Sequence, residues 1–162
     1  MRRILLALLV VLAGVVGFAS TANAASAHFI RASASGPQSN GTLVVSFKEA
    51  GLGDNQSITY VASADATAQY ACLNGGGNHP QAANKETVSG PVSATGTFSS
   101  GKNGTISQSL TLSPPSAGSF SCPNGQRLVL ASVSYSNVAI TDLTNDESES
   151  IAGTFSRTFF AI

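Results

Sequence analysis

Two histidines are the side chains in this sequence best suited to hold a transition metal. The chain contains only His28 and His79, and imidazole nitrogen is a favoured ligand of copper. Cleavage after Ala27, the last of three small residues, would make His28 the first residue of the exported chain. Its α-amine and imidazole would then chelate copper together, with His79 as a third nitrogen donor. The simpler interpretation is that His28 begins a strand beside Phe29 and that His79 lies in an unrelated loop.

An N-terminal histidine at the start of a β-sandwich resembles the histidine brace of lytic polysaccharide monooxygenases and related copper-binding sandwich proteins. The resemblance covers His28 and the strand pattern described below. It implies copper as a cofactor and a redox-active site at His28 and His79. A copper-binding protein is therefore the alternative to a function without a cofactor.

Carboxylates offer two further kinds of chemistry. One short segment concentrates negative charge, and hard oxygen ligands of this type suit Ca²⁺, although the spacing is not that of an EF-hand. A solvated turn is the other interpretation of this segment. Its acidic residues are Asp142, Asp146, Glu147 and Glu149.

The two remaining glutamates, Glu49 and Glu86, are the pair that a glycosidase would use. Glu49 follows Lys48 at the end of an expected strand, so an exposed ion pair is the simpler interpretation. Sugar-processing clefts stack rings on aromatic side chains, and this chain has no Trp and 3 Tyr. The sequence also lacks the GxSxG, HExxH and P-loop signatures. A secreted hydrolase is therefore the second alternative, and we expect no catalytic residues.

The first 24 residues have the pattern of a secretory signal peptide. Arg2 and Arg3 precede an apolar run over residues 4–18, and Ala22-Asn23-Ala24 matches the small residues that signal peptidase accepts. The run is shorter than the ~20 residues that a membrane-spanning helix needs. We therefore expect a signal peptide over 1–24 and one secreted, extracellular domain over 25–162, with no membrane span after cleavage. Cleavage after Ala24 leaves a shorter spacer than cleavage after Ala27.

Export determines how the cysteines are interpreted. Cys72 and Cys122 are the only two in the chain, and they are bound for an oxidising compartment. They lack the CxxC spacing of metal or redox pairs. The sequence therefore predicts a disulfide between them.

Alternating apolar and polar residues predict strands along most of the domain. Leu43, Val45 and Phe47 share one face of the first clear strand, and the same alternation over residues 58–72 places Cys72 on an inward face. No segment has helical periodicity. Seven to nine strands with short polar turns predict an all-β fold, a two-sheet Greek-key sandwich of immunoglobulin-like type.

Three local features refine this expectation. The clearest hairpin is expected over residues 92–112, around the turn-forming segment 99–104. The apolar positions change parity near Ser136 and Asn137, which predicts a β-bulge. Residues 142–150 are expected to form a polar loop before the last strand.

The amino-acid composition argues against some classes of binding partner. Only 10% of the 162 residues are charged and the formal net charge is +0, which argues against nucleic acid because phosphate binding needs clustered basic residues. A hydrophobic fraction of 43% argues against disorder. The segments Phe47–Leu52 and Cys122–Gln126 are similar to ones in small secreted β-sandwich proteins of unassigned function.

The longest irregular stretch, residues 74–89, begins two residues after Cys72. Long loops on rigid scaffolds often carry recognition, whereas a surface crossover is the other interpretation. We expect a secreted, non-enzymatic binding, surface or structural protein that contacts an extracellular ligand or surface through loops at one end of the sandwich. The candidate binding-loop residues are Asn74, Asn78, His79, Asn84 and Lys85.

Overall fold

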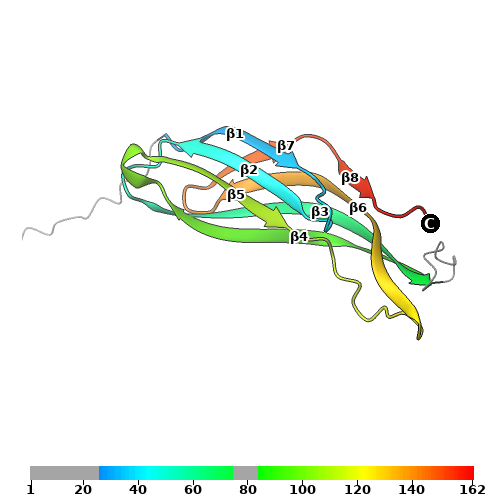
Figure 1. The fold of residues 1–162 in the computed structure, drawn as a ribbon. Helices are drawn as coiled ribbons and strands as arrows, with labels where there is room; N and C mark the ends of the chain where they lie inside the picture. Colours follow the sequence, from blue (N-terminus) through cyan, green and yellow to red (C-terminus); the bar gives the residue numbers. More distant parts are fainter. Residues whose placement is uncertain (1–25, 75–83) are drawn as a thin grey trace, which may run out of the picture.

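A computed structural model describes residues 26–74 and 84–162, which form eight strands in two antiparallel sheets (Figure 1). Sheet A has the order β1 (His28–Ser35), β2 (Leu43–Ala50), β5 (Thr105–Leu112). Sheet B has the order β4 (Lys85–Ser99), β3 (Ser57–Asn74), β6 (Gln126–Asp142), β7 (Glu147–Ile151), and β8 (Phe155–Thr158) also pairs with β6. The expected all-β class with two sheets and one disulfide is confirmed.

The only helical element in the described ranges is the single 3-10 turn η1 (Gly101–Asn103). No helix in that part of the chain is long and apolar enough to cross a membrane. Residues 1–24, which carry the expected signal peptide, lie outside the described residues.

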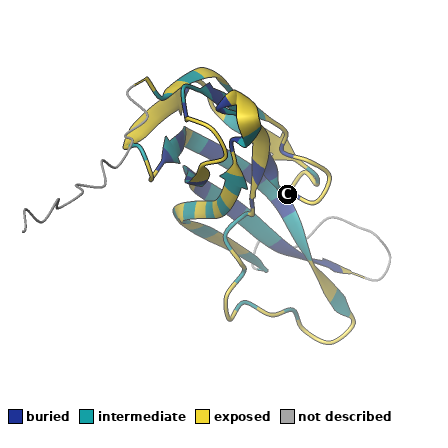
Figure 2. Ribbon diagram, turned by 90° about the vertical axis from the view of Figure 1, so that its left-hand side faces the viewer, coloured by how far each residue is buried: buried dark blue, intermediate teal, exposed yellow. Residues whose placement is uncertain are grey.

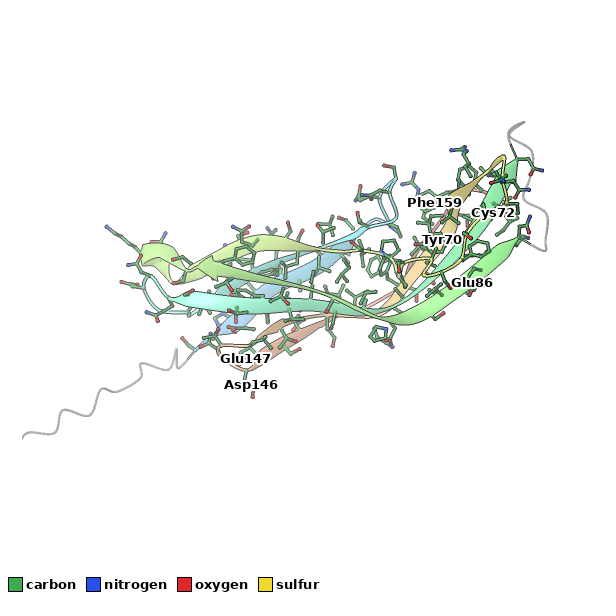
Figure 3. All side chains as sticks on the ribbon, turned by 90° about the horizontal axis from the view of Figure 1, so that it is seen from below. Tyr70, Cys72, Glu86, Asp146, Glu147 and Phe159 are labelled. Carbon is green, nitrogen blue, oxygen red and sulfur yellow. A yellow bond between two sulfur atoms is a disulfide. The ribbon has the colours of Figure 1, made fainter. Side chains whose placement is uncertain are left out.

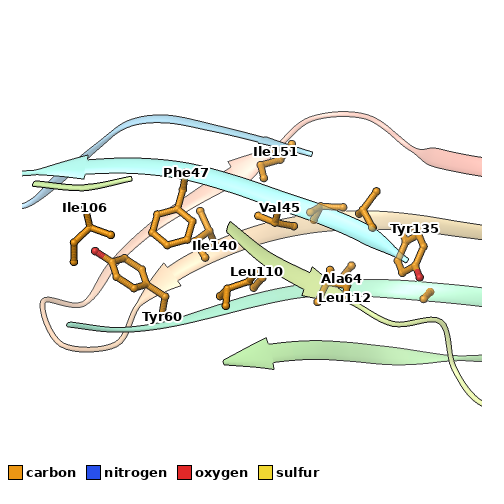
Figure 4. Packing of buried hydrophobic residues seen from close by; sticks show 14 of the residues in the cluster. Val45, Phe47, Tyr60, Ala64, Ile106, Leu110, Leu112, Tyr135, Ile140 and Ile151 are labelled. Carbon is orange, nitrogen blue, oxygen red and sulfur yellow. The ribbon is translucent and has the colours of Figure 1, made fainter. Parts of the chain in front are cut away.

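The core lies between the two sheets and follows the alternation of the sequence. In β2 the side chains of Leu43, Val45 and Phe47 are buried, as expected, while their neighbours face outward. Tyr60 and Tyr135 of sheet B are equally buried, near opposite ends of the core (Figure 4). Figure 2 shows the buried residues gathered between the layers. Each large apolar side chain buried in this way stabilises the fold by about 1.5–3 kcal/mol.

Strand β3 is longer than any segment that the sequence suggested. The alternation over residues 58–72 belongs to one strand of 18 residues, because neither Gly nor Pro interrupts it. Strands β3, β4 and β6 extend past sheet A at one end of the molecule (Figure 1). The bulge expected near Ser136 is confirmed: the β3–β6 register shifts opposite it, and Asn137 has a φ of 51°.

The hairpin expected over residues 92–112 is wrong. Strands β4 and β5 belong to different sheets, and the chain crosses from sheet B to sheet A at η1. Ser100 explains the crossing, because its buried hydroxyl donates to the carbonyl oxygen of Gly53 at 2.7 Å and accepts from the N–H of Gln56 at 2.9 Å. These bonds hold the β4–β5 connection against the β2–β3 connection, which also crosses between the sheets. A turn composition signals that the chain reverses, but not which sheet it enters.

The polar loop expected over residues 142–150 is also wrong, since it contains strand β7. Asp142 makes a tight turn possible, because its carboxylate accepts hydrogen bonds from the backbone N–H groups of Thr144 and Asn145 at 2.7 and 3.1 Å. Strand β7 is an edge strand, and only Ile151 in it is buried. An edge strand that contributes one side chain to the core shows almost no alternation in its sequence.

Candidate functional site

The disulfide end of the molecule is where the expected binding loop is anchored. Cys72 near the end of β3 and Cys122 before β6 form the predicted disulfide, with Cα atoms 5.6 Å apart. Figure 3 shows Cys72 at the end of the sandwich opposite Asp146 and Glu147. The bond ties the extended part of sheet B to the segment that leads into β6.

Three of the five candidate binding-loop residues lie at this end. Asn74 is the last residue of β3, and Lys85 is the first of β4. Asn84 is held on both sides: its carbonyl oxygen accepts from the N–H of Cys72 at 3.1 Å, and its amide donates to Gln126 Oε1 at 3.2 Å. Asn78 and His79 lie outside the described residues. Both ends of the loop are therefore fixed beside the disulfide.

A pocket of about 400 Å³ lies at the same end, between the start of β6, the C-terminal segment and the β1–β2 turn. Its walls are mostly apolar, and its polar groups come from a basic side chain and the turn. The lining residues are Ser39, Asn40, Arg127, Val129, Leu130, Phe159 and Phe160. None of them was among the binding residues expected from the sequence, because they come from three segments that are far apart along the chain.

The aromatic wall of the pocket is held by the backbone. The N–H groups of Phe159 and Phe160 both donate to the carbonyl oxygen of Ala131, at 2.7 and 3.2 Å. The guanidinium of Arg157 lies 5.1 Å from the centre of the Phe159 ring and donates to the carbonyl oxygen of Pro37 at 3.1 Å. A cation over an aromatic face contributes about 0.5–1 kcal/mol at an exposed site. These contacts hold the segment that carries the two rings against β6.

One basic side chain, that of Arg127, lines the pocket. Lys85 and Glu86 lie on β4, on the far side of β3 from β6, and Arg157 lies on β8. The acidic turn is at the other end of the molecule (Figure 3). The pocket thus combines apolar walls with one guanidinium group.

Tyr70 completes the end by anchoring the segment that carries Cys122. Its hydroxyl donates to the carbonyl oxygen of Pro115 at 2.6 Å. Burial raises the pKa of Tyr70 above its ordinary value. The phenol therefore stays protonated and keeps donating through the physiological range of pH.

A second group of polar side chains is buried at the opposite end. Glu49 and Asp142 are each 0% exposed, so the expected exposed ion pair of Glu49 with Lys48 is wrong. The alternation of β2 directs Glu49 inward with Phe47, while Lys48 lies on the other face of the strand. Glu49 faces Tyr60 and Asp142 of sheet B, and Glu86, the other glutamate of the expected catalytic pair, is exposed near the disulfide end (Figure 3).

The expected metal ligands that the structure describes do not form a metal site. His28 is exposed, and its Nδ1 donates to the carbonyl oxygen of Ser26 at 2.6 Å, whereas His79 lies outside the described residues. Asp142 is buried, but Asp146 and Glu147 are exposed. Across residues 26–74 and 84–162, no three His, Cys, Asp or Glu side chains are grouped closely enough to hold a metal ion.

Comparison with family models, curated proteins and solved structures finds no match to this chain.

Proposed function

We propose that this chain is a secreted, non-enzymatic binding protein that captures an extracellular ligand at the disulfide end of a β-sandwich. The observation that carries the proposal is the pocket of about 400 Å³ walled by Leu130, Phe159 and Phe160, with Arg127 among its lining residues. Small-molecule sites are typically concave and apolar, with a few polar groups that orient the ligand. The ligand class that fits is an apolar ring or chain that bears a negatively charged group.

The chemistry of the lining favours binding over catalysis. The polar groups among the described lining residues are the side chains of Ser39, Asn40 and Arg127. A guanidinium binds carboxylates and sulfonates through charge-assisted hydrogen bonds. The described lining supplies no histidine or carboxylate to act as a base beside Ser39.

We also propose that the fold is an immunoglobulin-like Greek-key sandwich. Sheet A has the order β1–β2–β5 and sheet B has the order β4–β3–β6–β7. These orders fit a sandwich of this type in which the fourth strand pairs with the third and belongs to the same sheet. The core position that a tryptophan fills in many such domains would be filled here by tyrosine. The disulfide supports export through the signal peptide at residues 1–24, because such bonds persist in oxidising compartments.

A fluorescence titration with 8-anilinonaphthalene-1-sulfonate tests the binding site, because this probe joins an apolar ring system to an anionic group. We expect saturable binding with one site per chain. Arg127→Gln should weaken it by about tenfold, the size of one charge-assisted hydrogen bond. Phe160→Ala should weaken it by a similar factor through lost apolar contact.

Matched controls lie at the other end of the molecule. Leu143→Ala removes an exposed apolar side chain, and Lys102→Gln removes an exposed cation, so both should leave the titration unchanged. Near-ultraviolet circular dichroism checks that each variant keeps its fold. Equal binding by Arg127→Gln, Phe160→Ala and the unmodified protein would place the ligand elsewhere.

A further inference from the structure

Three buried polar side chains lie together between the sheets, two on strands of sheet B and one on the middle strand of sheet A. Tyr60 of β3 and Asp142 of β6 are register partners, and Glu49 of β2 faces them across the core. All three side chains are 0% exposed. Neither carboxylate oxygen of Glu49, nor the hydroxyl of Tyr60, has a hydrogen-bond partner among the described residues. A buried polar group without a partner costs free energy, and a buried charge without one costs more.

Asp142 has hydrogen-bond donors around its carboxyl group, whereas Glu49 has none among the described residues. The carboxyl oxygens of Asp142 accept from the backbone N–H groups of Thr144 and Asn145 and from Asn145 Nδ2, the last at 2.6 Å. Ionisation of Glu49 would place a buried negative charge without a donor beside another carboxyl group.

No basic side chain faces Glu49 in the described parts of the chain to offset that charge. Its register partners in sheet A are Phe29 of β1 and Ile106 of β5, which do not ionise. The ionisable groups facing it from sheet B are Tyr60, Asp142 and Glu147 of β7. Asp142 and Glu147 disfavour a charged Glu49. The Tyr60 hydroxyl favours one, but burial of the carboxyl group outweighs it.

Among the described residues, the β6–β7 hairpin closes over sheet A without a hydrogen bond to it, while β6 pairs with β3 from Tyr60–Asp142 to Ser63–Ala139. The β2–β3 and β4–β5 connections are bonded to each other, since the N–H of Leu52 donates to the carbonyl oxygen of Gly104 at 3.0 Å. The turn of the hairpin is bonded to the start of β3, where the N–H of Leu143 donates to the carbonyl oxygen of Thr59 and the N–H of Thr59 donates to Thr144 Oγ1. The bulge at Asn137 lies at its base and provides a bending point.

We propose that Glu49, Tyr60 and Asp142 form a proton-operated latch between the two sheets. With Glu49 protonated, the β6–β7 hairpin closes over β1 and β2. Loss of the proton drives the hairpin away from sheet A and breaks its pairing with β3 between Tyr60 and Ser63. This opening uncovers the aromatic cluster of Phe29, Phe47 and Tyr60. Rings in this cluster are 4.5–6.3 Å apart between centroids, so opening would expose a substantial apolar surface.

Electrostatics place the change near neutral pH. Burial raises the pKa of Glu49 to about 7; the Tyr60 hydroxyl lowers this pKa and the Asp142 carboxylate raises it, although neither contact has hydrogen-bond geometry. Opening that returns Glu49 to water is linked to one proton. The opening equilibrium should therefore rise tenfold per pH unit until Glu49 is ionised in the closed state.

Nuclear magnetic resonance of the unmodified protein tests the latch, with isotope-labelled tyrosine rings and a neutral nitroxide in solution. Tyr60 lies in the latch, and Tyr135, equally buried, lies at the other end of the core (Figure 4). We expect the relaxation enhancement of the Tyr60 ring to grow roughly 40-fold between pH 5 and 7 and then to level off. The Tyr135 ring should show no such growth.

Two variants distinguish opening at the latch from a general loosening of the fold. Glu49→Gln should abolish the growth at Tyr60, whereas Glu86→Gln, at an exposed site near the disulfide end, should preserve it. If Glu49→Gln does not fold, the carboxyl carbon signal of Glu49 in the unmodified protein should titrate over the pH range in which the Tyr60 growth levels off. Equal growth at Tyr60 and Tyr135, or growth that persists in Glu49→Gln, would overturn the proposal.

Discussion

The hydroxyl of Tyr135 in sheet B donates a hydrogen bond of 2.8 Å to the carbonyl oxygen of Gly41, in the turn that joins β1 to β2 of sheet A. The bond crosses the core from one sheet to the other and is fully buried. Burial raises the pKa of Tyr135 to about 12, so the phenol remains a donor at physiological pH. Tyr60, the other fully buried tyrosine, makes no corresponding bond among the described residues.

This contrast predicts opposite results for the same substitution. Tyr135→Phe should lower the free energy of unfolding by about 1–3 kcal/mol, because the Gly41 carbonyl oxygen is left buried without a donor. Tyr60→Phe removes a hydroxyl that has no partner, so it should leave stability unchanged or raise it. Urea unfolding of both variants gives the comparison, and an equal loss in both would contradict the assigned bond.

Removal of the disulfide should be the most destabilising of these changes. The bond closes a loop with a sequence separation of 50, which corresponds to about 4 kcal/mol in the chain-entropy treatment. The paired variant Cys72→Ser with Cys122→Ser should therefore melt well below the unmodified protein. Reduction of the unmodified protein should produce a similar drop in melting temperature, and no drop in either would show that the bond adds little.

Ser100 should contribute more to the free energy of unfolding than its small side chain suggests. Ser100→Ala removes both the donor to Gly53 and the acceptor for Gln56 in a buried position, at a cost of about 1–3 kcal/mol. Ser93→Ala, at an exposed position of β4, should change stability by less than about 0.5 kcal/mol. Denaturant unfolding of the two variants measures the difference, and equal stabilities would show that the two connections do not need this link.

Glu49 should make the protein less stable as pH rises through the acidic range. Its pKa is raised in the folded state to about 7 from 4.5, so its contribution to stability is fully present below pH 4.5 and is lost as pH rises to about 7. The loss amounts to about 3 kcal/mol. The difference in unfolding free energy between Glu49→Gln and the unmodified protein, followed from pH 4 to 8, isolates this effect. A difference that does not vary with pH would contradict the raised pKa.

Features set by neighbours in the chain were predictable from the sequence. The alternation through Leu43, Val45 and Phe47 reflects the two-residue period of a strand, which any half-buried strand must follow. The parity change near Asn137 revealed a bulge for the same reason. The two cysteines predicted their own bond, because the sequence holds no third cysteine to compete with them.

Features set by contacts between distant segments were not predictable in this way. The crossing of the chain at Ser100, the pairing of β7 and the pocket beside Phe159 each depend on which segments meet in space. Glu49 shows the difference most clearly. Its place in the alternation of β2 specified an inward direction, but its burial depends on β3 and β6 lying across the core. Local sequence specifies the direction of a side chain within a strand, whereas only tertiary packing specifies what it meets.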